Sequence, residues 1–473
     1  MRESVIHSSA NGNAYLYDAR HMFSMLIHPA LGKVHSKLTE ADSYYHKKHA
    51  YLQAHDFYGS VKPPDFETEL GENVVKNNLL NSTKIVFEVT DHCNLNCAYC
   101  SLGELYETEK NVRKNLNSRY AINLLKYVFD LQVKQKNGKL MIDFYGGEPL
   151  ANIRLIKKIV EAANQLNAGK ALELEFSMTT NATLLDEHIH FLVSNQFRLA
   201  ISLDGNAEGH SYRTFARDNK NSFRKVIENL DMIQRDFPSY FAGNISFISI
   251  LHKRNSVKSI YNFIYNRYQQ IPEIMQLNTG FINPAKKEQF ERIFQNRRKS
   301  EEEYQDEAPG LVPGTHEKLI SYNEANRFLR SFSVNFYLSN IHYLLYDRVI
   351  PVPTGTCKGF EGKIFLNTQH NLFPCEKISY KYALGRVNEK VIIDVPAIAK
   401  KHSFYFEKIK KVCQKCYAFK SCSICMWTIE NLEKLDNEEL VCPGFQDHEA
   451  FAKNLDRIFS FLEKIRMIFY EEK

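Results

Sequence analysis

The chain lacks long apolar runs, a secretory signal and low-complexity tracts. Its 473 residues are 44% hydrophobic and 25% charged, which is typical of a globular protein of several domains. No run approaches the roughly 20 apolar residues that cross a bilayer. The first residues, Met1 to Ala10, also lack the apolar segment of a signal peptide. We therefore expect a soluble, cytoplasmic protein with no membrane partner.

An excess of charge of one sign is also absent. The formal net charge is +6, and the basic residues are spread along the chain. The short basic group Arg297–Lys299 is followed almost at once by the acidic group Glu301–Glu303. Such groups are typical of solvated surfaces, whereas nucleic-acid binding requires a clustered basic patch. The sequence therefore predicts no nucleic-acid partner.

Cysteine is scarce, but its positions are informative. The chain has ten cysteines, all in spacings that suit metal ligation. The first three are Cys93, Cys97 and Cys100. The later seven are Cys357, Cys375, Cys413, Cys416, Cys422, Cys425 and Cys442. Three thiolates on one loop hold three corners of a cubane iron–sulfur cluster and leave one iron open, while seven are one short of the ligands of two further clusters.

Two other uses of cysteine have to be weighed against iron–sulfur ligation. The spacing from Cys413 to Cys425 also suits a structural zinc knuckle. The triad upstream and the three further cysteines favour clusters over zinc. A disulfide framework is disfavoured because thiols stay reduced in the cytoplasm.

The sequence Cys93-Asn-Leu-Asn-Cys97-Ala-Tyr-Cys100 resembles the cluster loop of the radical S-adenosylmethionine (SAM) superfamily. The later seven cysteines resemble the SPASM extension of its peptide-modifying members, so the resemblance covers about residues 83–445. It implies that the open iron of a [4Fe–4S] cluster binds SAM, and that an electron from the cluster cleaves SAM to methionine and a 5′-deoxyadenosyl radical. It also implies that Tyr99 lies beside the adenine.

The apolar pattern around the triad predicts alternating strands and helices. Alternation indicates strands at 85–89, 140–145, 172–178, 199–203, 245–251 and 275–282, and helical spacing indicates segments such as 122–129 and 257–268. Six strands alternating with helices predict an α/β fold, a parallel (βα)6 sheet curved into a partial TIM-like barrel. Ligands bind at the carboxyl ends of such strands, where the unusual loops of this sequence lie.

The loop after the second strand carries candidate SAM contacts. Gly146 and Gly147 allow the backbone to approach a ligand closely, and Glu148 offers a carboxylate to an ammonium group. With Pro149 they resemble the GGEP motif, which holds the amino group of SAM in the family.

Three more candidates follow the next strands. Asn181 suits a helix N-cap or a left-handed turn as well as a cofactor contact. Ser202 and Arg213 match positions where the family contacts the ribose and the carboxylate of SAM. Arginine suits a bidentate carboxylate pair, although Arg213 could equally be a surface residue.

The resemblance also divides the later cysteines between two auxiliary [4Fe–4S] clusters. By position, the first is held by Cys357, Cys375 and Cys425, with its fourth ligand unidentified. The second is held by Cys413, Cys416, Cys422 and Cys442. Two features depart from the family pattern. Only Ser423 and Ile424 separate Cys422 from Cys425, and His370 replaces the glycine before Cys375. His370 and Asn371 adopt positive φ more readily than most residues, so the turn can survive.

We expect four stretches along the chain. Residues 1–82 contain a hairpin of 13–17 with 22–27 and helices at 29–37 and 40–55, which predict a winged-helix-like module that binds a leader peptide as an added strand. A cap on the barrel is the alternative. Residues 83–285 form the radical SAM barrel and 286–345 a bridging helical region with loops at Pro309-Gly310 and Pro313-Gly314. Residues 346–473 form the SPASM domain and a C-terminal helix.

The primary hypothesis is a radical SAM maturase that installs a thioether, carbon–carbon or carbon–oxygen crosslink in a ribosomally made precursor peptide. Its reductant would be a flavodoxin or ferredoxin. The alternative enzyme is a sulfatase-maturing enzyme that forms formylglycine, a family with Asp where this chain has Glu376. Glu376 is the candidate catalytic base, or else a surface glutamate paired with Lys377 or Lys381. An alternative of a different class is a non-catalytic iron–sulfur electron-transfer or peptide-carrier protein.

Overall fold

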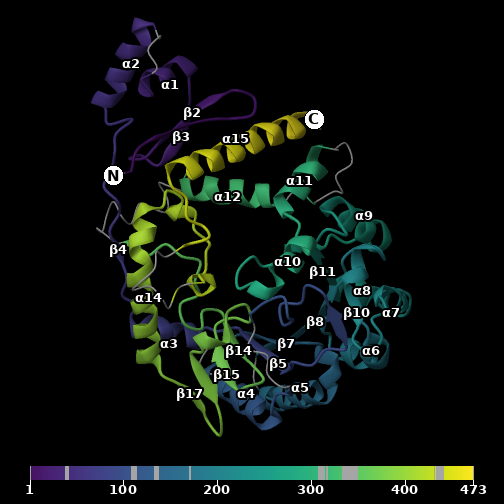
Figure 1. The fold of residues 1–473 in the computed structure, drawn as a ribbon. Helices are drawn as coiled ribbons and strands as arrows, with labels where there is room; N and C mark the ends of the chain where they lie inside the picture. The colour runs from purple at the N-terminus through teal and green to yellow at the C-terminus, as the bar shows by residue number, and fades with distance from the viewer. Residues whose placement is uncertain are drawn as a thin grey trace. The chain divides into compact units, whose positions relative to one another are not determined.

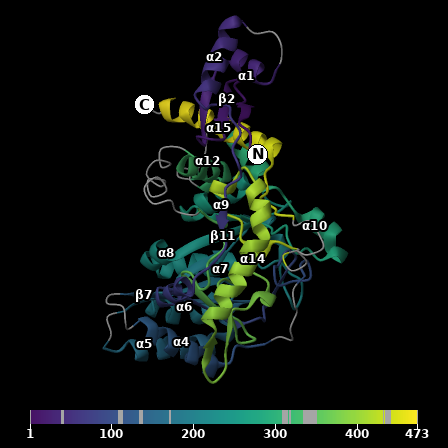
Figure 2. The same ribbon diagram turned by 90° about the vertical axis from the view of Figure 1, so that its left-hand side faces the viewer.

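The computed structural model describes residues 2–37, 42–107, 114–132, 138–169, 172–306, 315, 318–332, 350–430, 432 and 441–471. Their contacts form two units, which we describe separately (Figures 1 and 2). Unit 1 lies within 1–69, 316–356 and 403–473, and unit 2 within 70–315 and 357–402. The four stretches expected from the sequence stay a prediction. No described helix has the length and apolar character needed to cross a membrane.

Unit 2 is built on one ten-stranded sheet, ordered β12-β11-β9-β8-β7-β5-β14-β15-β16-β17. Its parallel strands are β5 (Lys84–Thr90), β7 (Lys139–Gly146), β8 (Glu173–Thr180), β9 (Arg198–Ser202), β11 (Ile245–Leu251) and β12 (Glu273–Gln276). They pair in chain order, so the predicted six-stranded parallel sheet is confirmed. Strand β14 (Lys363–Leu366) joins the other side of β5 in parallel, and β15 (Asn371–Phe373), β16 (Gly385–Val387) and β17 (Val391–Ile393) follow it in antiparallel pairs. The sheet therefore continues past β5 and stays open, as a partial barrel does.

Helices connect the parallel strands of unit 2 and surround its ends. They are α3 (Glu72–Leu80), α4 (Ser118–Gln132), α5 (Ile153–Asn167), α6 (Leu185–Ser194), α7 (Phe223–Asp236), α8 (Pro238–Asn244), α9 (Val257–Tyr268), α10 (Lys287–Ile293) and α11 (Arg297–Asp306). The short elements are η1 (Pro149–Asn152) and a ribbon of β6 (Leu95–Cys97) with β10 (Arg213–Phe215). The predicted helix at 257–268 is confirmed by α9.

The two faces of the sheet differ in polarity. Residues such as Phe87 on β5 are fully buried, and Figure 1 shows α4 and α5 along the sheet. Side chains alternate across a strand, so the neighbours of these apolar residues point to the opposite face. There Lys84 Nζ lies 2.8 Å from the Asp143 carboxylate, and Arg198 Nη2 lies 2.8 Å from that of Glu175. The polar face is the one suited to hold a polar ligand.

The last predicted strand is displaced. We expected a strand over 275–282, whereas β12 ends at Gln276. Gln276 pairs with Leu251, the last residue of β11, so no partner strand extends further. The following residues leave the sheet, and Ile282 forms a bridge with Tyr106 in the segment after the cysteine triad. The end of the expected strand, Phe281-Ile282, therefore pairs with that segment instead of extending the sheet.

Unit 1 begins with an antiparallel sheet of β1 (Val5–Ser8), β2 (Ala14–Asp18) and β3 (Phe23–Ile27), followed by α1 (Pro29–His35) and α2 (Ser43–Ala54). The expected hairpin is confirmed, and β1 was missed. Asp18 holds the turn because its Oδ1 accepts from the backbone nitrogens of Arg20 and His21 at 3.1 and 2.8 Å. The winged-helix assignment stays a prediction.

The remaining elements of unit 1 come from later in the chain. They are β4 (Phe66–Glu67), α12 (Ile320–Phe332), β13 (Ile350–Pro351) and α15 (His448–Glu471), with α14 (Val395–Lys415) starting in unit 2 and ending in unit 1. Helices α12 and α15 lie side by side (Figures 1 and 2). The predicted loops at Pro309-Gly310 and Pro313-Gly314 lie outside the described residues.

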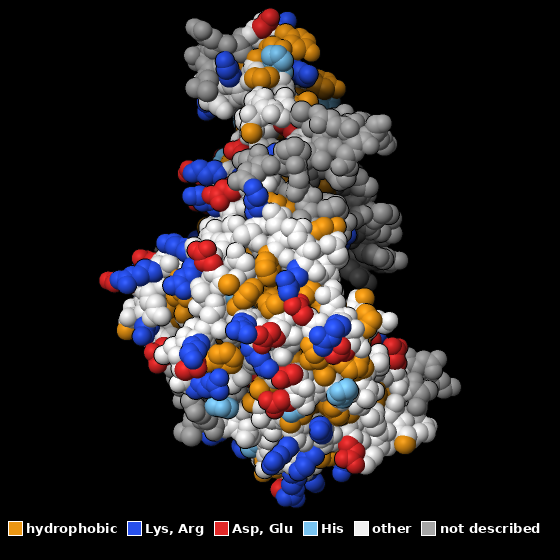
Figure 3. All heavy atoms as spheres, turned by 90° about the vertical axis from the view of Figure 1, so that its right-hand side faces the viewer, with side chains coloured by type: hydrophobic (Ala, Val, Ile, Leu, Met, Phe, Trp, Pro, Cys, Tyr) orange, Lys and Arg blue, Asp and Glu red, His pale blue; other side chains and the backbone are white. Residues whose placement is uncertain are grey.

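Charges of both signs alternate on the surface of unit 2. Figure 3 shows Lys and Arg interspersed with Asp and Glu over its helical side, as in the Arg224–Glu228 pair of α7 at 2.7 Å. One basic group departs from the expected solvated face. Arg297 is mostly buried, and its Nε lies 2.7 Å from the buried Glu301 carboxylate, so this pair joins successive turns of α11.

The β14–β15 turn confirms the expectation for His370. Its φ is +68°, the left-handed region. Asn367 closes the turn, because its Oδ1 accepts from the Asn371 nitrogen at 2.9 Å and its carbonyl accepts from the His370 nitrogen at 3.0 Å. The His370 ring contacts Tyr120, with ring centroids 4.5 Å apart. A non-glycine residue therefore holds the turn that precedes Cys375.

This turn predicts a selective effect of branching at position 370. His370→Val places a β-branched side chain at positive φ and removes the Tyr120 contact, so we expect a loss of about 1–2 kcal/mol. His370→Asn tolerates the same φ and serves as the matched control. The midpoint of thermal unfolding of the full chain measures both variants. Equal midpoints for the two variants would contradict a left-handed backbone conformation at position 370.

Candidate functional site

Four loops of unit 2 leave the same edge of the parallel sheet. The cysteine triad follows β5, the Gly146-Gly147-Glu148 turn ends β7, Asn181 follows β8, and Asp204 follows β9. Parallel strands place all their carboxyl ends at one edge, so residues far apart in the sequence meet there. This edge is the candidate site.

The cysteine loop is held as part of a small ribbon. All ten cysteines are free thiols. Cys97 lies opposite Arg213 in the β6–β10 ribbon, and the Ala98 nitrogen donates to the Tyr212 carbonyl at 3.0 Å. Burial raises the pKa of Cys93 and of Cys97 to about 12. These thiols therefore keep their protons unless a metal displaces them, as iron does when a cluster forms.

The paired glycines serve the cysteine loop itself. We expected them to admit a ligand to the backbone. A Cβ at Gly146 would lie 2.0 Å from the Thr90 carbonyl oxygen, and one at Gly147 would lie 2.4 Å from that of His92. The Gly147 and Glu148 nitrogens donate to the same two oxygens, both at 2.9 Å. Any side chain at either glycine would displace the segment that leads into Cys93.

Glu148 is a buried carboxylate with hydrogen bonds but no cation. Its Oε1 accepts from the Leu150 nitrogen at 3.1 Å and from Thr180 Oγ1 at 2.7 Å, and its Oε2 accepts from the Asn181 nitrogen at 2.8 Å. Burial raises its pKa to about 7, although these bonds oppose the shift. Among the described residues no Lys, Arg or His forms an ion pair with it. A bound ammonium group would supply that charge. Pro149, next in the chain, begins η1.

Asn181 connects the β8 loop to the cysteine loop. Its Nδ2 donates to Asn94 Oδ1 at 2.9 Å and lies 3.7 Å from Cys93 Sγ. Its Oδ1 accepts from the Thr183 nitrogen at 3.0 Å. The helix-cap and left-handed interpretations are wrong, because α6 starts at Leu185 and the residue at positive φ is Ala182.

Asp204 is the residue that the sequence reasoning missed. Its buried carboxylate accepts from Arg213 Nε at 2.8 Å, from Arg213 Nη2 at 3.0 Å and from the Ile250 nitrogen at 2.8 Å. The Tyr99 hydroxyl donates to it as well. Burial alone would raise the pKa of Asp204, but the Arg213 charge and the hydrogen bonds from His252 and Arg213 hold it well below its usual range. The Asp-Gly pair at a strand end was the available signal.

The same contacts place Tyr99 and Arg213. Tyr99 is buried, and its ring stacks on His252 with centroids 5.4 Å apart. The Arg213 guanidinium lies 5.4 Å from the Tyr99 ring centroid. Arg213 is therefore buried, contrary to the surface alternative, with two of its nitrogens bonded to Asp204. Ser202 ends β9 on the polar face, four residues from Arg198 on the same strand.

A pocket of unit 2 opens beside this edge. It has a volume of about 580 Å³ and is lined by His92, Cys93, Asn94, Thr183, Arg217 and Lys225, among others. It includes one thiol of the triad and neither Glu148 nor Asp204 among its lining residues. It therefore lies beside the predicted SAM contacts.

Four of the later thiols share a buried site in unit 1. Burial, and to a lesser extent the nearby thiols Cys422, Cys442 and Cys416, raise the pKa of Cys413 to about 12. A small pocket among them is lined by apolar residues such as Val412. Four thiols in apolar surroundings suit a cluster ligated by thiolates. In the described part of the chain, no three His, Cys, Asp or Glu side chains converge on a single metal position.

The other three thiols are divided between the units. Cys357 and Cys375 belong to unit 2, and Cys425 belongs to unit 1. The short link from Cys422 to Cys425 is held by its neighbours, because the Ile424 carbonyl accepts from the Gly355 nitrogen and from Thr354 Oγ1, both at 2.9 Å.

Glu376 has a different partner from those expected. Lys363 Nζ lies 2.8 Å from its Oε2 and 3.2 Å from its Oε1, so the proposed pairing with Lys377 or Lys381 is wrong. Burial would raise the pKa of Glu376, but Lys363 lowers it overall. The side chain is mostly buried and stays ionised at neutral pH, while its role as a base stays a prediction.

Comparison with known proteins agrees with this geometry. Residues 87–260 match the Radical SAM superfamily, and this part of the chain is a radical SAM domain. A cysteine-type anaerobic sulfatase-maturating enzyme of Clostridium perfringens is 23% identical over 70% of this chain and 84% of its own length. The radical SAM cyclopropyl synthase TigE of Paramaledivibacter caminithermalis is 26% identical over 33% of each chain.

A solved structure extends the similarity to the fold. Native anSMEcpe with bound AdoMet and Cp18Cys peptide superposes with a TM-score of 0.52 at 17% identity, covering 82% of this chain and 99% of its own. Most of the chain therefore shares the fold of a protein that holds AdoMet together with a peptide.

The Asp204 contacts predict a large effect of a small substitution. Asp204→Asn removes the charge and leaves the Arg213 guanidinium buried without a counter-charge, which costs about 3–5 kcal/mol. We expect a marked fall in the thermal midpoint and weaker SAM binding by titration calorimetry. The control is Asp218→Asn, whose carboxylate sits near the exposed side chains of Arg217 and Lys220 and contributes about 0–1 kcal/mol. Similar midpoints for the two variants would argue against this anchor.

Proposed function

We propose that this chain is a radical SAM maturase that installs a side-chain crosslink in a ribosomally made peptide. The observation that carries the proposal is the convergence of the cysteine triad, Glu148 and Asp204 at one edge of the parallel sheet. The triad offers thiols for a cluster. Glu148 offers an ammonium group a carboxylate that has no cation partner among the described residues. Asp204 anchors Tyr99 and Arg213 beside them. The polar face of the sheet would receive the peptide.

The residues of the site have distinct roles in this proposal. A [4Fe–4S] cluster on Cys93, Cys97 and Cys100 would supply the electron that cleaves SAM to methionine and a 5′-deoxyadenosyl radical. Glu148 would bind the SAM ammonium group. Asp204 would hold Tyr99 beside the adenine and keep Arg213 oriented. Because a primary carbon radical is so reactive, the chain has mainly to position its target and exclude water.

Ser202 and Asn181 complete the proposed SAM site. Ser202 would contact the ribose from the polar face. Asn181 would act indirectly, because its amide already bonds to Asn94 in the cysteine loop. Glu376, the residue after Cys375, would accept a proton from the substrate, and its ion pair with Lys363 would keep it ionised beforehand.

The later cysteines would bind two auxiliary [4Fe–4S] clusters, as the resemblance to the SPASM extension implies. The four thiols of unit 1 would hold one, and Cys357, Cys375 and Cys425 the other. These clusters would accept an electron from the substrate when a crosslink forms. A flavodoxin or ferredoxin would reduce the first cluster.

The alternative reaction is formylglycine formation on a sulfatase. The similarity to sulfatase-maturating enzymes supports it as strongly as TigE supports peptide maturation. What favours a precursor peptide with a leader is the sheet at the start of unit 1, because a leader could add to it as a strand.

Only one edge of that sheet is available among the described residues. The β1 edge is covered by α15, where Asp456 accepts from the Ser8 nitrogen at 2.6 Å and Ser460 accepts from the Ala10 nitrogen at 2.7 Å. Among the described strands, β3 pairs only with β2, and Leu26 on it is 65% exposed. An unpaired edge with an exposed aliphatic side chain suits an added peptide strand.

The reaction class is tested by coexpression with small peptides encoded beside the gene. We expect a crosslinked peptide that lacks two hydrogen atoms and does not react with a hydrazide, together with 5′-deoxyadenosine. Formylglycine would instead give a hydrazide-reactive aldehyde. The control is the triple variant Cys93→Ala, Cys97→Ala, Cys100→Ala, which should form no 5′-deoxyadenosine. Absence of 5′-deoxyadenosine from the intact, iron-loaded chain would leave only the non-catalytic carrier hypothesis.

The peptide-binding edge is tested by Leu26→Lys. In the proposed complex the peptide covers Leu26, and the lysine removes this apolar contact. Burying a leucine side chain contributes about 1.5–3 kcal/mol, so peptide binding should weaken about tenfold to a hundredfold. Fluorescence anisotropy with the labelled peptide of the coexpression assay measures it. Ile392→Lys is the matched control, since Ile392 is an aliphatic residue, 50% exposed, on the edge strand β17. Equal affinities for the two variants would remove β3 as the docking edge.

A further inference from the structure

We propose that Arg2 is a positioning residue for the four-thiol site of unit 1, formed by Cys413, Cys416, Cys422 and Cys442. The inference rests on the proposed auxiliary cluster at these thiols. It adds a residue from the opposite end of the chain, outside the cysteine-rich segment. Its role would be to hold the Cys413–Cys416 turn and to supply positive charge beside it.

Arg2 binds the end of the helix that carries Cys413. Its Nη2 donates to the carbonyl oxygens of Cys413 at 3.2 Å and Gln414 at 3.0 Å. Both lie in the last turn of α14, where carbonyl groups lack helical partners. A cation at a helix C-terminus satisfies these groups and interacts favourably with the helix dipole. The Cys413 carbonyl also accepts from the Cys416 nitrogen at 3.2 Å, so Arg2 binds the turn that joins the two cysteines.

Arg2 is itself held rigidly. Its backbone exchanges two hydrogen bonds of 2.8 Å with Val61, and its guanidinium lies 4.1 Å from the centroid of the Phe419 ring. The next residue is tied to the same segment, because the Glu3 nitrogen donates to the Tyr417 hydroxyl at 2.9 Å. Arg2 is only 6% exposed. A side chain fixed at this many points can define the position of what it binds.

The charge of Arg2 lacks a carboxylate partner among the described residues. A buried cation is costly unless it is paired, and its hydrogen bonds go to neutral carbonyl groups. The Cys413 and Cys416 thiols interact electrostatically with Arg2, and they become thiolates when they ligate iron. Arg2 would then be the counter-charge of the cluster, and positive charge near a cluster favours its reduced form.

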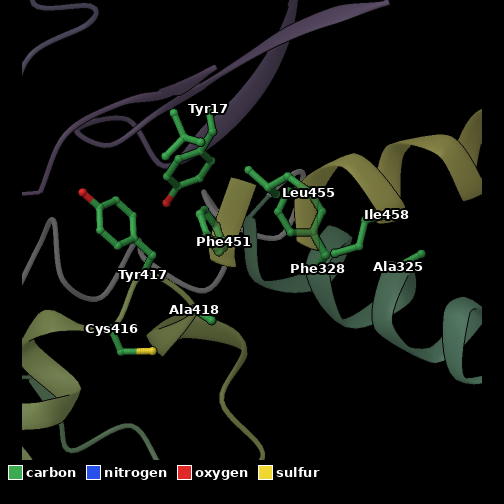
Figure 4. Packing of buried hydrophobic residues seen from close by; sticks show 10 residues of the cluster. Tyr17, Ala325, Phe328, Cys416, Tyr417, Ala418, Phe451, Leu455 and Ile458 are labelled. Atoms are coloured by element: carbon green, nitrogen blue, oxygen red, sulfur yellow. The ribbon is translucent and has the colours of Figure 1, made fainter. Parts of the chain in front are cut away.

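The surrounding core explains how an N-terminal residue reaches this site. Val5 and Tyr17 of the first sheet pack in one buried cluster with Cys416 and Tyr417 (Figure 4). Phe451 of α15 contacts both tyrosine rings, with centroids 5.0 Å from Tyr17 and 5.8 Å from Tyr417. The sheet proposed to bind the leader therefore shares a core within unit 1 with Cys416, one of the four thiols.

The first test uses the full chain without iron and compares Arg2→Met, Arg2→Lys and wild type. Loss of the two Arg2 hydrogen bonds should loosen the Cys413–Cys416 turn and expose its thiols, and we expect this to outweigh the rise in the Cys413 pKa that follows loss of the cation. Alkylation by N-ethylmaleimide, mapped by mass spectrometry, should therefore be about tenfold faster at Cys413 and Cys416 in Arg2→Met. Arg2→Lys keeps the charge but loses the planar guanidinium group, so its alkylation rates should lie between those of wild type and Arg2→Met. Cys93 and Cys97, in unit 2, are the internal control and should be unchanged, which also reports that the variant is folded. The matched surface control is Arg20→Met, since Arg20 is half exposed and pairs with Asp56.

The second test uses the reconstituted chain. Removing the cation should make reduction of the auxiliary cluster about tenfold less favourable, a shift of about −59 mV in a redox titration followed by electron paramagnetic resonance. The first cluster should keep its potential. Wild-type alkylation rates and an unchanged potential in Arg2→Met would overturn the inference. A wild-type chain that binds iron only at the first triad would overturn the proposed auxiliary cluster, while alkylation would still decide the role of Arg2.

Discussion

The candidate site depends on one buried carboxylate. Asp204 accepts hydrogen bonds from Tyr99 on the cysteine loop, from Arg213 on the adjoining strand and from the Ile250 nitrogen of β11. Tyr99 lies between two of the triad cysteines, and Arg213 lies opposite the middle one. A single anion thereby joins the irregular loop to the regular sheet. Without it the loop would keep backbone bonds to its partner ribbon but would lose its hydrogen-bonded link to β11.

The two buried carboxylates of the site differ in a way that suits different tasks. Arg213 keeps the pKa of Asp204 low, so Asp204 stays ionised and structural. Burial raises the pKa of Glu148 to about 7, and no side-chain cation among the described residues offsets it. Environments that separate the pKa values of two similar groups in this way are typical of functional sites. Glu148 is therefore suited to a cationic ligand, and Asp204 to holding the frame around it.

The beginning and the end of the chain are interdependent within unit 1. The first sheet packs with Cys416, Tyr417 and helix α15, and α15 covers one of its edges. This leaves β3 as the edge on which a peptide could add. A peptide bound there would lie on a sheet that shares its core with Cys416, one of the four thiols. Removing the N-terminal residues would consequently disturb the thiol site as well as any peptide-binding surface.

Much of the architecture could be predicted from the sequence, because it depends on local patterns. Alternating apolar residues determine the parallel strands, and cysteine spacing identifies the ligand loops. His370 was recognised as a residue able to take positive φ. Other features depend on contacts between segments distant in sequence. Gly146 and Gly147 are required because the Thr90–His92 backbone leaves no room for a side chain. Asp204 acts through its contacts with Tyr99 and Arg213. Glu376 pairs with Lys363 instead of its neighbours in the sequence. Folding decided these partners because buried charges and polar groups must be satisfied by whichever segments the sheet topology brings together.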